Sequence, residues 1–144
     1  MRCPACGGQG PLQLGAGTEV EVGTVAVALE RRPLLACPAG HDHSPAAVVA
    51  GGVHAVAEQL PRGRARLLRA TVCTHCGERL ELPVRRTRRT VTVVEEGVPV
   101  HTLHLDVPMT RCGACGLDQV PERSQDDVDA AVRAAYAPGP PPAA

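Results

Sequence analysis

Two stretches of the chain decide the fold that we expect: CTHCG at residues 73–77 and VPMTRCGACG at residues 107–116. Each contains a C-x-x-C pair followed directly by glycine, and roughly 36 residues separate the two pairs. Two such pairs supply the four ligands that tetrahedral zinc takes, and the interval has room for a β-hairpin. The pattern is typical of a zinc ribbon. It predicts a metal site formed by Cys73, Cys76, Cys112 and Cys115.

A similar pattern precedes it in the chain. Cys3 and Cys6 form a C-x-x-C pair, and the stretch CPAGH adds Cys37 and His41. These residues predict a second zinc site of three cysteines and one histidine. His43 is the alternative ligand to His41, which we favour because a C-x-x-x-H spacing keeps the reach short. We therefore expect two zinc ions per chain, with iron as an alternative at the four-cysteine site.

Three C-x-x-C pairs and one C-x-x-x-H at matching intervals favour structural metal over thiol redox chemistry, and the cysteine count and three glycines agree with metal sites. The chain has seven cysteines, an odd number that fits poorly with a disulfide framework. Gly7, Gly77 and Gly116 each follow the second cysteine of a pair. Glycine tolerates the positive φ that such a turn often needs. The other histidines are expected to have no metal role: His54, His75, His101 and His104.

The two halves of the chain show the same order of elements, which suggests a duplication. In both halves large apolar residues recur at every second position, as they do in strands. The alternating positions are Val20, Val22, Val25, Val27 and Leu29, then Val91, Val93, Leu103, Leu105 and Val107. Glu95-Glu96-Gly97 is a turn candidate between the later strands.

Each half then ends in a predicted helix. The first covers about residues 45–60 with Ser44 as N-cap, and the second covers about residues 125–136 with Ser124 as N-cap. We therefore expect a small metal-stabilised α+β fold of two tandem zinc ribbons, each an antiparallel hairpin or sheet plus a short helix. The ribbons would span residues 1–68 and 69–137, followed by a disordered Pro-rich tail at 138–144. Whether they share one sheet is left open by the sequence.

The composition limits what the core and the surface can be. The chain has one Tyr, no Phe and no Trp, so Val, Leu and Ala must form the core, and a small core of this kind usually needs metals or disulfides. The formal net charge is +0, whereas general nucleic-acid binders carry a net positive charge. No signal peptide or membrane-spanning stretch is visible, so we expect a cytoplasmic protein with no membrane partner.

The arginines form two groups along the chain. They are Arg62, Arg64, Arg66 and Arg69, then Arg85, Arg86, Arg88 and Arg89. We interpret them as a solvated linker and a protected strand edge, with an anion-binding patch as the alternative.

Residues 70–137 resemble the YgiT-type zinc finger, the N-terminal zinc domain of MqsA-like antitoxins. CTHCG at 73–77, the strand-rich insert, and VPMTRCGACG at 107–116 followed by a helix carry the resemblance. Residues 1–68 look like a diverged copy in which His41 replaces a lost cysteine. The resemblance implies a zinc-stabilised module that binds a protein partner, often a toxin. The antitoxins carry a helix-turn-helix domain after the zinc domain, whereas here one helix and a Pro-rich tail follow, so repressor activity is not expected.

These observations predict a zinc-binding protein-interaction module, antitoxin-like or a small regulatory adaptor. No phosphate loop, nucleophile elbow or zinc-protease motif is present, and closed zinc sites leave no position for a reacting water, so we expect no enzyme activity. The alternative is a nucleic-acid-binding zinc-ribbon protein of transcription or translation, which the arginine groups favour. The lack of aromatic stacking residues and the neutral charge disfavour it.

Overall fold

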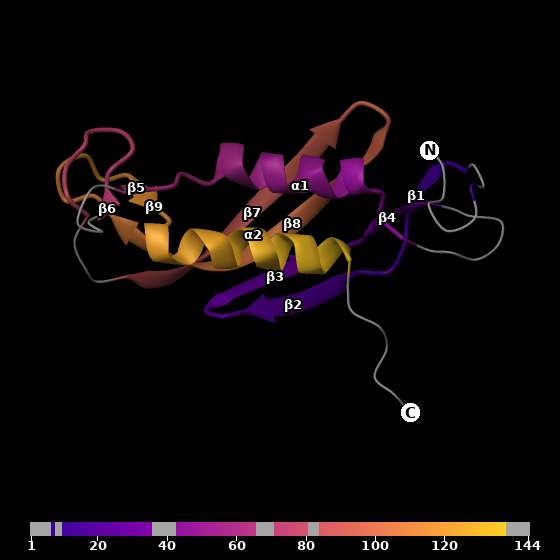
Figure 1. Ribbon diagram of the computed structural model, residues 1–144, viewed down its shortest axis with the longest axis horizontal. Coiled ribbons are helices and arrows are strands. Elements are labelled where there is room, and N and C mark those ends of the chain that lie inside the picture. Colours follow the sequence, from indigo (N-terminus) through magenta and orange to yellow (C-terminus); the bar gives the residue numbers. More distant parts are fainter. Residues whose placement is uncertain (1–6, 8–9, 36–42, 66–70, 81–83, 138–144) are drawn as a thin grey trace.

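The computed structural model describes residue 7 and residues 10–35, 43–65, 71–80 and 84–137, and it shows a small α+β fold with antiparallel sheets and two helices (Figure 1). The elements follow in the order β1 (Leu12–Leu14), β2 (Thr18–Val22), β3 (Val25–Leu29), β4 (Pro33–Leu35), α1 (Ala46–Gln59), β5 (Arg64–Ala65), β6 (Thr71–Val72), β7 (Arg85–Glu95), β8 (Val98–Arg111), β9 (Asp118–Gln119) and α2 (Glu122–Tyr136). The alternating stretches are strands and both predicted helices are present.

The central sheet has the strand order β2-β3-β8-β7, and β9 pairs with the end of β8. All of these pairs are antiparallel. Two tight turns join neighbouring strands, and each contains a glycine with positive φ: Gly23 at 58° and Gly97 at 77°. The second of these is the turn predicted at residues 95–97. Short pairs, β1 with β4 and β5 with β6, lie at opposite ends of the molecule (Figure 1).

The pairing of β3 with β8 joins the two halves of the chain. Val27 lies opposite Leu105 and Leu29 opposite Leu103 in this pair. The structure thus answers what the sequence left open, because strands from both halves form one sheet. The boundary that we predicted near residue 68 does not divide this sheet.

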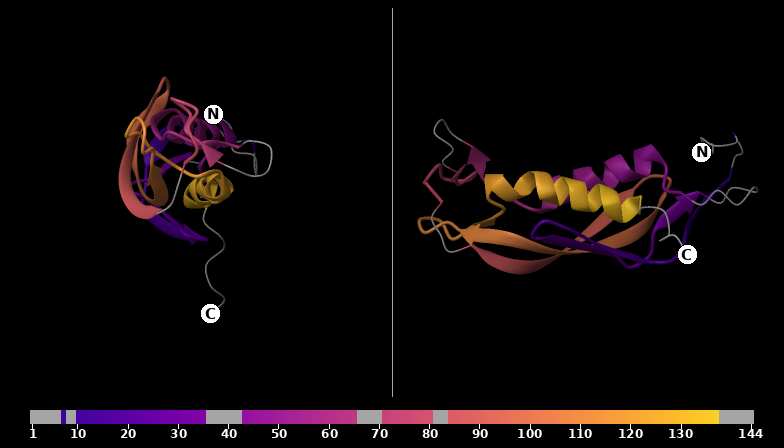
Figure 2. Two further views of the ribbon diagram at one scale, coloured as in Figure 1. Left: turned by 90° about the vertical axis from the view of Figure 1, so that its left-hand side faces the viewer. Right: turned by 60° about the horizontal axis from the view of Figure 1, so that its bottom comes forward.

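Both helices cover the same face of the central sheet (Figure 2). α2 packs over β2 and β3, and α1 packs beside α2 over β7. Alternation along the strands turns Val, Leu and Met side chains towards the helices, where they form one cluster. Its buried members are Val25, Val27, Leu29, Val48, Ala55, Val56, Leu60, Val91, Val93, Leu103, Leu105, Val107, Met109, Val120, Val128, Ala131, Val132, Ala135 and Tyr136. The two halves therefore share this core as well.

The helix starts differ from the prediction. The N-cap of α1 is Pro45 and that of α2 is Pro121, and neither has a side-chain capping bond. Ser44 instead donates its hydroxyl to the carbonyl of Pro33 at 2.8 Å, which ties the helix start to β4. Ser124 lies inside the first turn of α2 and is buried. The predicted serine caps are wrong, because Ser44 bonds to β4 instead and because α2 begins before Ser124, at Glu122.

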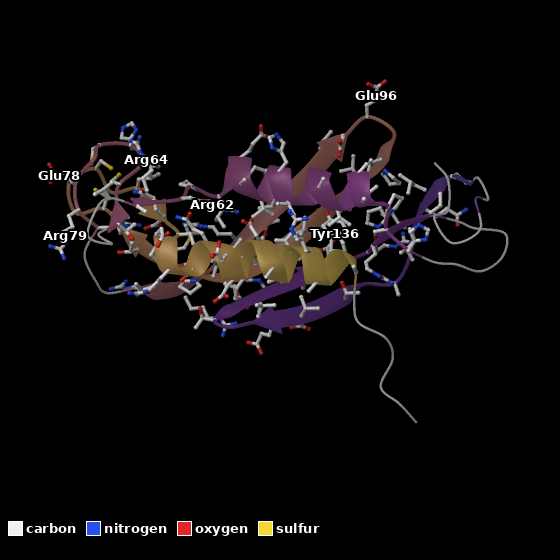
Figure 3. All side chains as sticks on the ribbon, viewed as in Figure 1. Arg62, Arg64, Glu78, Arg79, Glu96 and Tyr136 are labelled. Atoms are coloured by element: carbon white, nitrogen blue, oxygen red, sulfur yellow. The ribbon has the colours of Figure 1, made fainter. Side chains whose placement is uncertain are left out.

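The single tyrosine links both helices to the sheet (Figure 3). Tyr136 lies at the end of α2, and its hydroxyl is 2.6 Å from Nε2 of His101 on β8. Nδ1 of His101 donates to the carbonyl of Pro99 at 2.8 Å, so Nε2 of the neutral ring accepts from the tyrosine. A side chain at Gly52 of α1 would overlap the tyrosine ring. Gly52 therefore makes room for the largest core side chain.

Candidate metal centre

The four cysteines of the second predicted site come together at one end of the molecule. Their Sγ atoms all lie within 4.8 Å of one another, a group that could hold a metal ion. Sγ of Cys73 is 3.6 Å from that of Cys115, and Sγ of Cys76 is 3.5 Å from that of Cys112. The sulfur atoms appear beside Arg64 and close to Glu78 and Arg79 (Figure 3). The structure thus brings together all four members of this predicted ligand set.

Each cysteine pair is presented by the same backbone turn. The amide of Gly77 donates to the carbonyl of Cys73 at 3.0 Å, and the amide of Gly116 donates to that of Cys112 at 2.8 Å. The amides of the two first cysteines in turn donate to carbonyls beyond the turn, those of Glu78 and Leu117. β6 leads directly into Cys73 and β8 into Cys112. Two equivalent turns at the ends of strands therefore face one another.

The glycine after each pair has the left-handed backbone that the sequence predicted. The φ angles are 78° at Gly77, 78° at Gly116 and 71° at Gly7. No heavy atom beyond the neighbouring residues lies within 4 Å of where a Cβ would stand at any of them. Backbone conformation, rather than lack of space, is what requires glycine here. Gly7, which follows the first predicted pair, is described and has the same left-handed conformation as the other two.

The two cysteines of each turn differ in burial and in acidity. Cys73 and Cys112 are buried, whereas Cys76 and Cys115 are exposed. Burial raises the pKa of the Cys73 thiol, but the amides of Cys76 and His75 and the side chain of Gln119 outweigh it and lower the pKa to about 6. At Cys76 the backbone contact with Glu78 lowers the pKa, but partial desolvation of the sulfur and the neighbouring sulfur atoms raise it to about 12. A bound cation would favour the thiolate form of all four.

Gln119 is a part of the site that sequence reasoning missed. It is fully buried, and its Nε2 donates to Sγ of Cys73 at 2.9 Å while its Oε1 accepts from the amide of Thr74 at 2.7 Å. Gln119 lies on β9, which follows the turn of Cys112 and Cys115. Its side chain thus holds the turn of Cys73 and Cys76 in place. Such contacts orient metal ligands from outside the coordination shell. The signal in the sequence was a polar residue within the short stretch LDQVP after the last cysteine.

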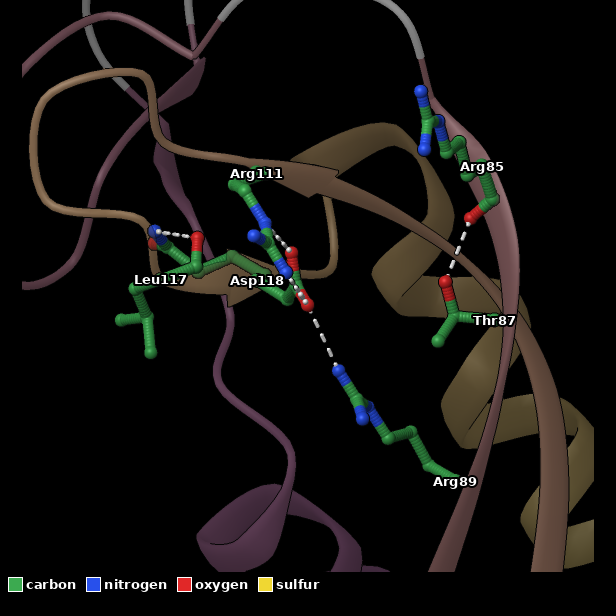
Figure 4. Close-up of polar contacts among 7 residues, drawn as sticks. Arg85, Thr87, Arg89, Arg111, Leu117 and Asp118 are labelled. Carbon is green, nitrogen blue, oxygen red and sulfur yellow. Dashed lines mark hydrogen bonds and ion pairs between the residues drawn. The ribbon is translucent and has the colours of Figure 1, made fainter.

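An ion-pair cluster lies next to the cysteine turns (Figure 4). The carboxylate of Asp118 is 3.1 Å from Nε of Arg111 and 3.1 Å from Nη2 of Arg89. The hydrogen bond from Arg111, followed by the charges of both arginines, lowers the pKa of Asp118 despite its partial burial. Arg64 donates to the carbonyl of Thr74 in the first cysteine turn at 3.1 Å. Arginines therefore surround a site that four thiolates and a divalent ion would leave negatively charged.

The first predicted site, Cys3, Cys6, Cys37 and His41, lies outside the described residues. His43, the alternative ligand, is described, and its carbonyl accepts from the amide of Leu35 at 2.9 Å. The choice between His41 and His43 stays a prediction. Arg66 and Arg69, and the tail at residues 138–144, are likewise not described.

The remaining histidines occupy other environments. His54 is exposed on α1, and its Nε2 is 3.0 Å from the carboxylate of Glu58. His104 lies on the face of the sheet opposite the helices, 2.7 Å from Glu30 and 3.2 Å from Thr90. His75 contributes a backbone amide, 3.4 Å from Sγ of Cys73. In the part of the chain that the structure describes, the one group that could hold a metal consists of cysteines alone.

Comparison with known proteins gives no match: no family model, no curated protein and no solved structure matches the chain. The resemblance of residues 70–137 to the YgiT-type zinc finger therefore stays a prediction. None of the helices in the described ranges is both long enough and apolar enough to cross a membrane.

Proposed function

We propose that this protein is a zinc-stabilised module that binds a protein partner. The observation that carries the proposal is the group of four cysteine sulfurs within 4.8 Å, held by two equivalent turns. Four thiolates in a tetrahedral arrangement are the donor set of structural zinc, and they also suit iron. We favour zinc because two C-x-x-C turns at the ends of strands are the arrangement found in zinc ribbons.

The donor set supports a structural role. Four protein ligands complete the coordination of zinc and leave no position for a reacting water. The protein would then act through its surface rather than through chemistry at the metal. The resemblance to antitoxin zinc domains implies a toxin protein as one class of partner. A second zinc ion, held by Cys3, Cys6, Cys37 and His41, is part of the proposal.

Native mass spectrometry together with elemental analysis tests the metal. We expect two zinc ions in the full chain, and one in the Cys112→Ser variant. Iron in place of one zinc would correct the metal without changing the role. Metal-free protein with intact disulfides would overturn the proposal.

Chromatography and affinity capture test the partner class. We expect weak retention on an immobilised single-stranded oligonucleotide at about 0.15 M salt, and capture of a protein whose binding is lost on chelation of the metal. Strong retention that falls steeply with salt would favour the nucleic-acid alternative, for which the arginines of β7 are the specific observation.

A further inference from the structure

β7 is an edge strand, and one side of it carries hydrogen-bonding groups that the sheet leaves open. It pairs with β8 on one side only. At Thr92 the open side is occupied by the side-chain amide of Gln59 from α1. Nε2 of Gln59 donates to the carbonyl of Thr92 at 2.8 Å, and Oε1 accepts from its amide at 3.3 Å. This amide makes the two bonds that a peptide group of a neighbouring strand would make.

Because the backbone amide and carbonyl of Thr92 point away from β8, the direction of the same groups in the preceding residues of β7 can be inferred. In an antiparallel pair, alternate residues point their amide and carbonyl groups towards the partner strand or away from it. The register of β7 on β8 runs without a shift from Arg85 to Val93. Thr90, Arg88 and Arg86 therefore point the same groups outward as Thr92 does. The carbonyl of Thr102, opposite Thr92, accepts from Glu30 beyond β3 and agrees with this alternation.

The outward groups of Arg86, Arg88 and Thr90 meet no partner among the described residues. α1 packs against the other end of β7, near its turn, as Figure 1 shows. An open edge of this kind is a template for an added strand. The open segment is thus bounded by Gln59 at one end and by Arg85 at the other.

The side chains along this segment are basic on both faces. Arg86 and Arg88 lie on the face away from the helices, and Arg85 and Arg89 lie on the opposite face. Arg86 reaches Glu21 at 3.2 Å and Arg89 reaches Asp118, whereas no ion pair to a described residue engages Arg85 or Arg88. An added strand with acidic side chains would meet arginines on either face.

We propose that an acidic extended segment of a partner protein adds as a strand to the edge of β7 at residues 86–90. The inference rests on the proposed protein-binding role and names the surface and the chemistry of the partner. The backbone ladder supplies the binding energy, and the arginines select for acidic side chains. Two copies of this chain joined through β7 would place arginines against arginines, which disfavours self-pairing at this edge.

Peptide binding tests the proposal on the full, metal-loaded chain. The probe is a labelled peptide of alternating glutamate and valine with blocked ends. The first control is the same peptide with N-methyl groups on alternate residues, which removes ladder donors and keeps the charge. The second is a lysine–valine peptide. We expect the first peptide alone to bind, measured by fluorescence anisotropy at low salt.

Matched charge reversals locate the surface. Arg88→Glu should weaken binding of the acidic peptide roughly tenfold or more, because it turns an attraction into a repulsion. Arg123→Glu makes the same charge change at an exposed position of α2 and should leave binding unchanged. Amide exchange should slow at Arg86, Arg88 and Thr90 on peptide addition, with no change at Thr92.

Several outcomes would overturn the inference. They are equal binding of the N-methylated peptide, no binding at low salt, or binding that Arg88→Glu leaves intact. Concentration-dependent oligomers that Arg88→Glu abolishes would instead make the acidic β2 of a second copy the occupant. Preference for an oligonucleotide over the peptide would make the surface a nucleic-acid site. If a captured protein still binds the Arg88→Glu variant in a metal-dependent manner, only the edge proposal fails and the proposed function stands.

Discussion

The central sheet with its helices and the cysteine end of the molecule are held together by different interactions. The centre buries a continuous cluster of aliphatic side chains between the sheet and both helices. The cysteine end contains β5, β6 and β9, of two residues each, and the two cysteine turns. Among the described residues of this end, the buried ones are chiefly Val72, Cys73, Cys112 and Gln119. Apolar burial organises the first region, whereas clustered cysteine sulfurs and hydrogen bonds organise the second.

This difference indicates where each region obtains its stability. A buried aliphatic side chain contributes about 1.5–3 kcal/mol, so the centre gains from many independent contributions. The described residues of the cysteine end bury too little apolar surface to offset the entropy of ordering its turns, which costs roughly 1–2 kcal/mol per residue. The metal ion that we propose at the four cysteines would supply that deficit. Loss of the metal should therefore affect one region far more than the other.

The largest expected effect is that of Cys112→Ser. Removing one ligand should abolish binding of the ion at this site, and structural zinc contributes about 10–16 kcal/mol of apparent binding free energy in small peptides. We expect hydrogen exchange to show lost protection at residues 71–80 and 112–119. Protection at Val91, Leu103 and Leu105 should persist. Removing the metal from the wild-type protein with a chelator should produce the same selective loss of protection. Loss of protection throughout the chain would mean that the core also depends on the metal.

Leu105→Ala tests the apolar core of the central sheet. Leu105 is fully buried on β8 between β3 and β7, so its truncation should lower the free energy of unfolding by about 2–5 kcal/mol in urea denaturation. Val100→Ala is the matched control, because Val100 on the same strand is 57% exposed and its truncation should change little. Equal effects of the two substitutions would contradict the assignment of the core.

Tyr136→Phe tests a single polar contact within the apolar region. It removes the hydroxyl that donates to Nε2 of His101 and leaves a buried acceptor without its partner. The free energy of unfolding should fall by about 1–3 kcal/mol. Metal content should stay unchanged, because the pair belongs to the core. A fall in bound metal would show that the two regions are coupled through α2.

The same histidine should make the core sensitive to acid. Burial lowers the pKa of His101 in the folded state from 6.5, against smaller opposing effects of Pro99 and Glu95. The unfolded chain therefore binds this proton more readily, and the stability that neutral His101 contributes is present above about pH 6.5 and falls as the pH drops below it. His101→Leu should show a smaller loss of stability between pH 7.5 and pH 5.5. An unchanged loss would assign the acid sensitivity to other groups.

The smallest effect is expected at a turn glycine. Gly116→Ala places a Cβ on a residue with φ 78° and should cost about 1–2 kcal/mol in the metal-loaded protein. Gly113→Ala in the same turn is the control, because its φ is not positive and its Cβ would stand in open space. Thermal unfolding of the two variants side by side measures the difference. Equal melting temperatures would show that the turn tolerates strain.

The sequence by itself determined the features that depend on neighbouring residues. The spacing of Cys73, Cys76, Cys112 and Cys115 indicated a common site, and the positive φ at Gly77 followed from its place after a cysteine pair. Alternation of apolar residues identified the long strands, and the helices lie within a few residues of the predicted ranges. These features are local because a turn, a strand face or a helix stripe is encoded over a few consecutive positions.

Only the tertiary structure decided the features that depend on distant partners. Leu105 could have faced a strand of either half, and its pairing beside Val27 follows from burying both on one helix-covered face. Gln119 became part of the metal centre because the chain returns beside Cys73, and Ser44 left the helix cap for Pro33 of β4. Such choices depend on which groups compete for the same buried space and hydrogen bonds. Spacing along the chain does not record that competition.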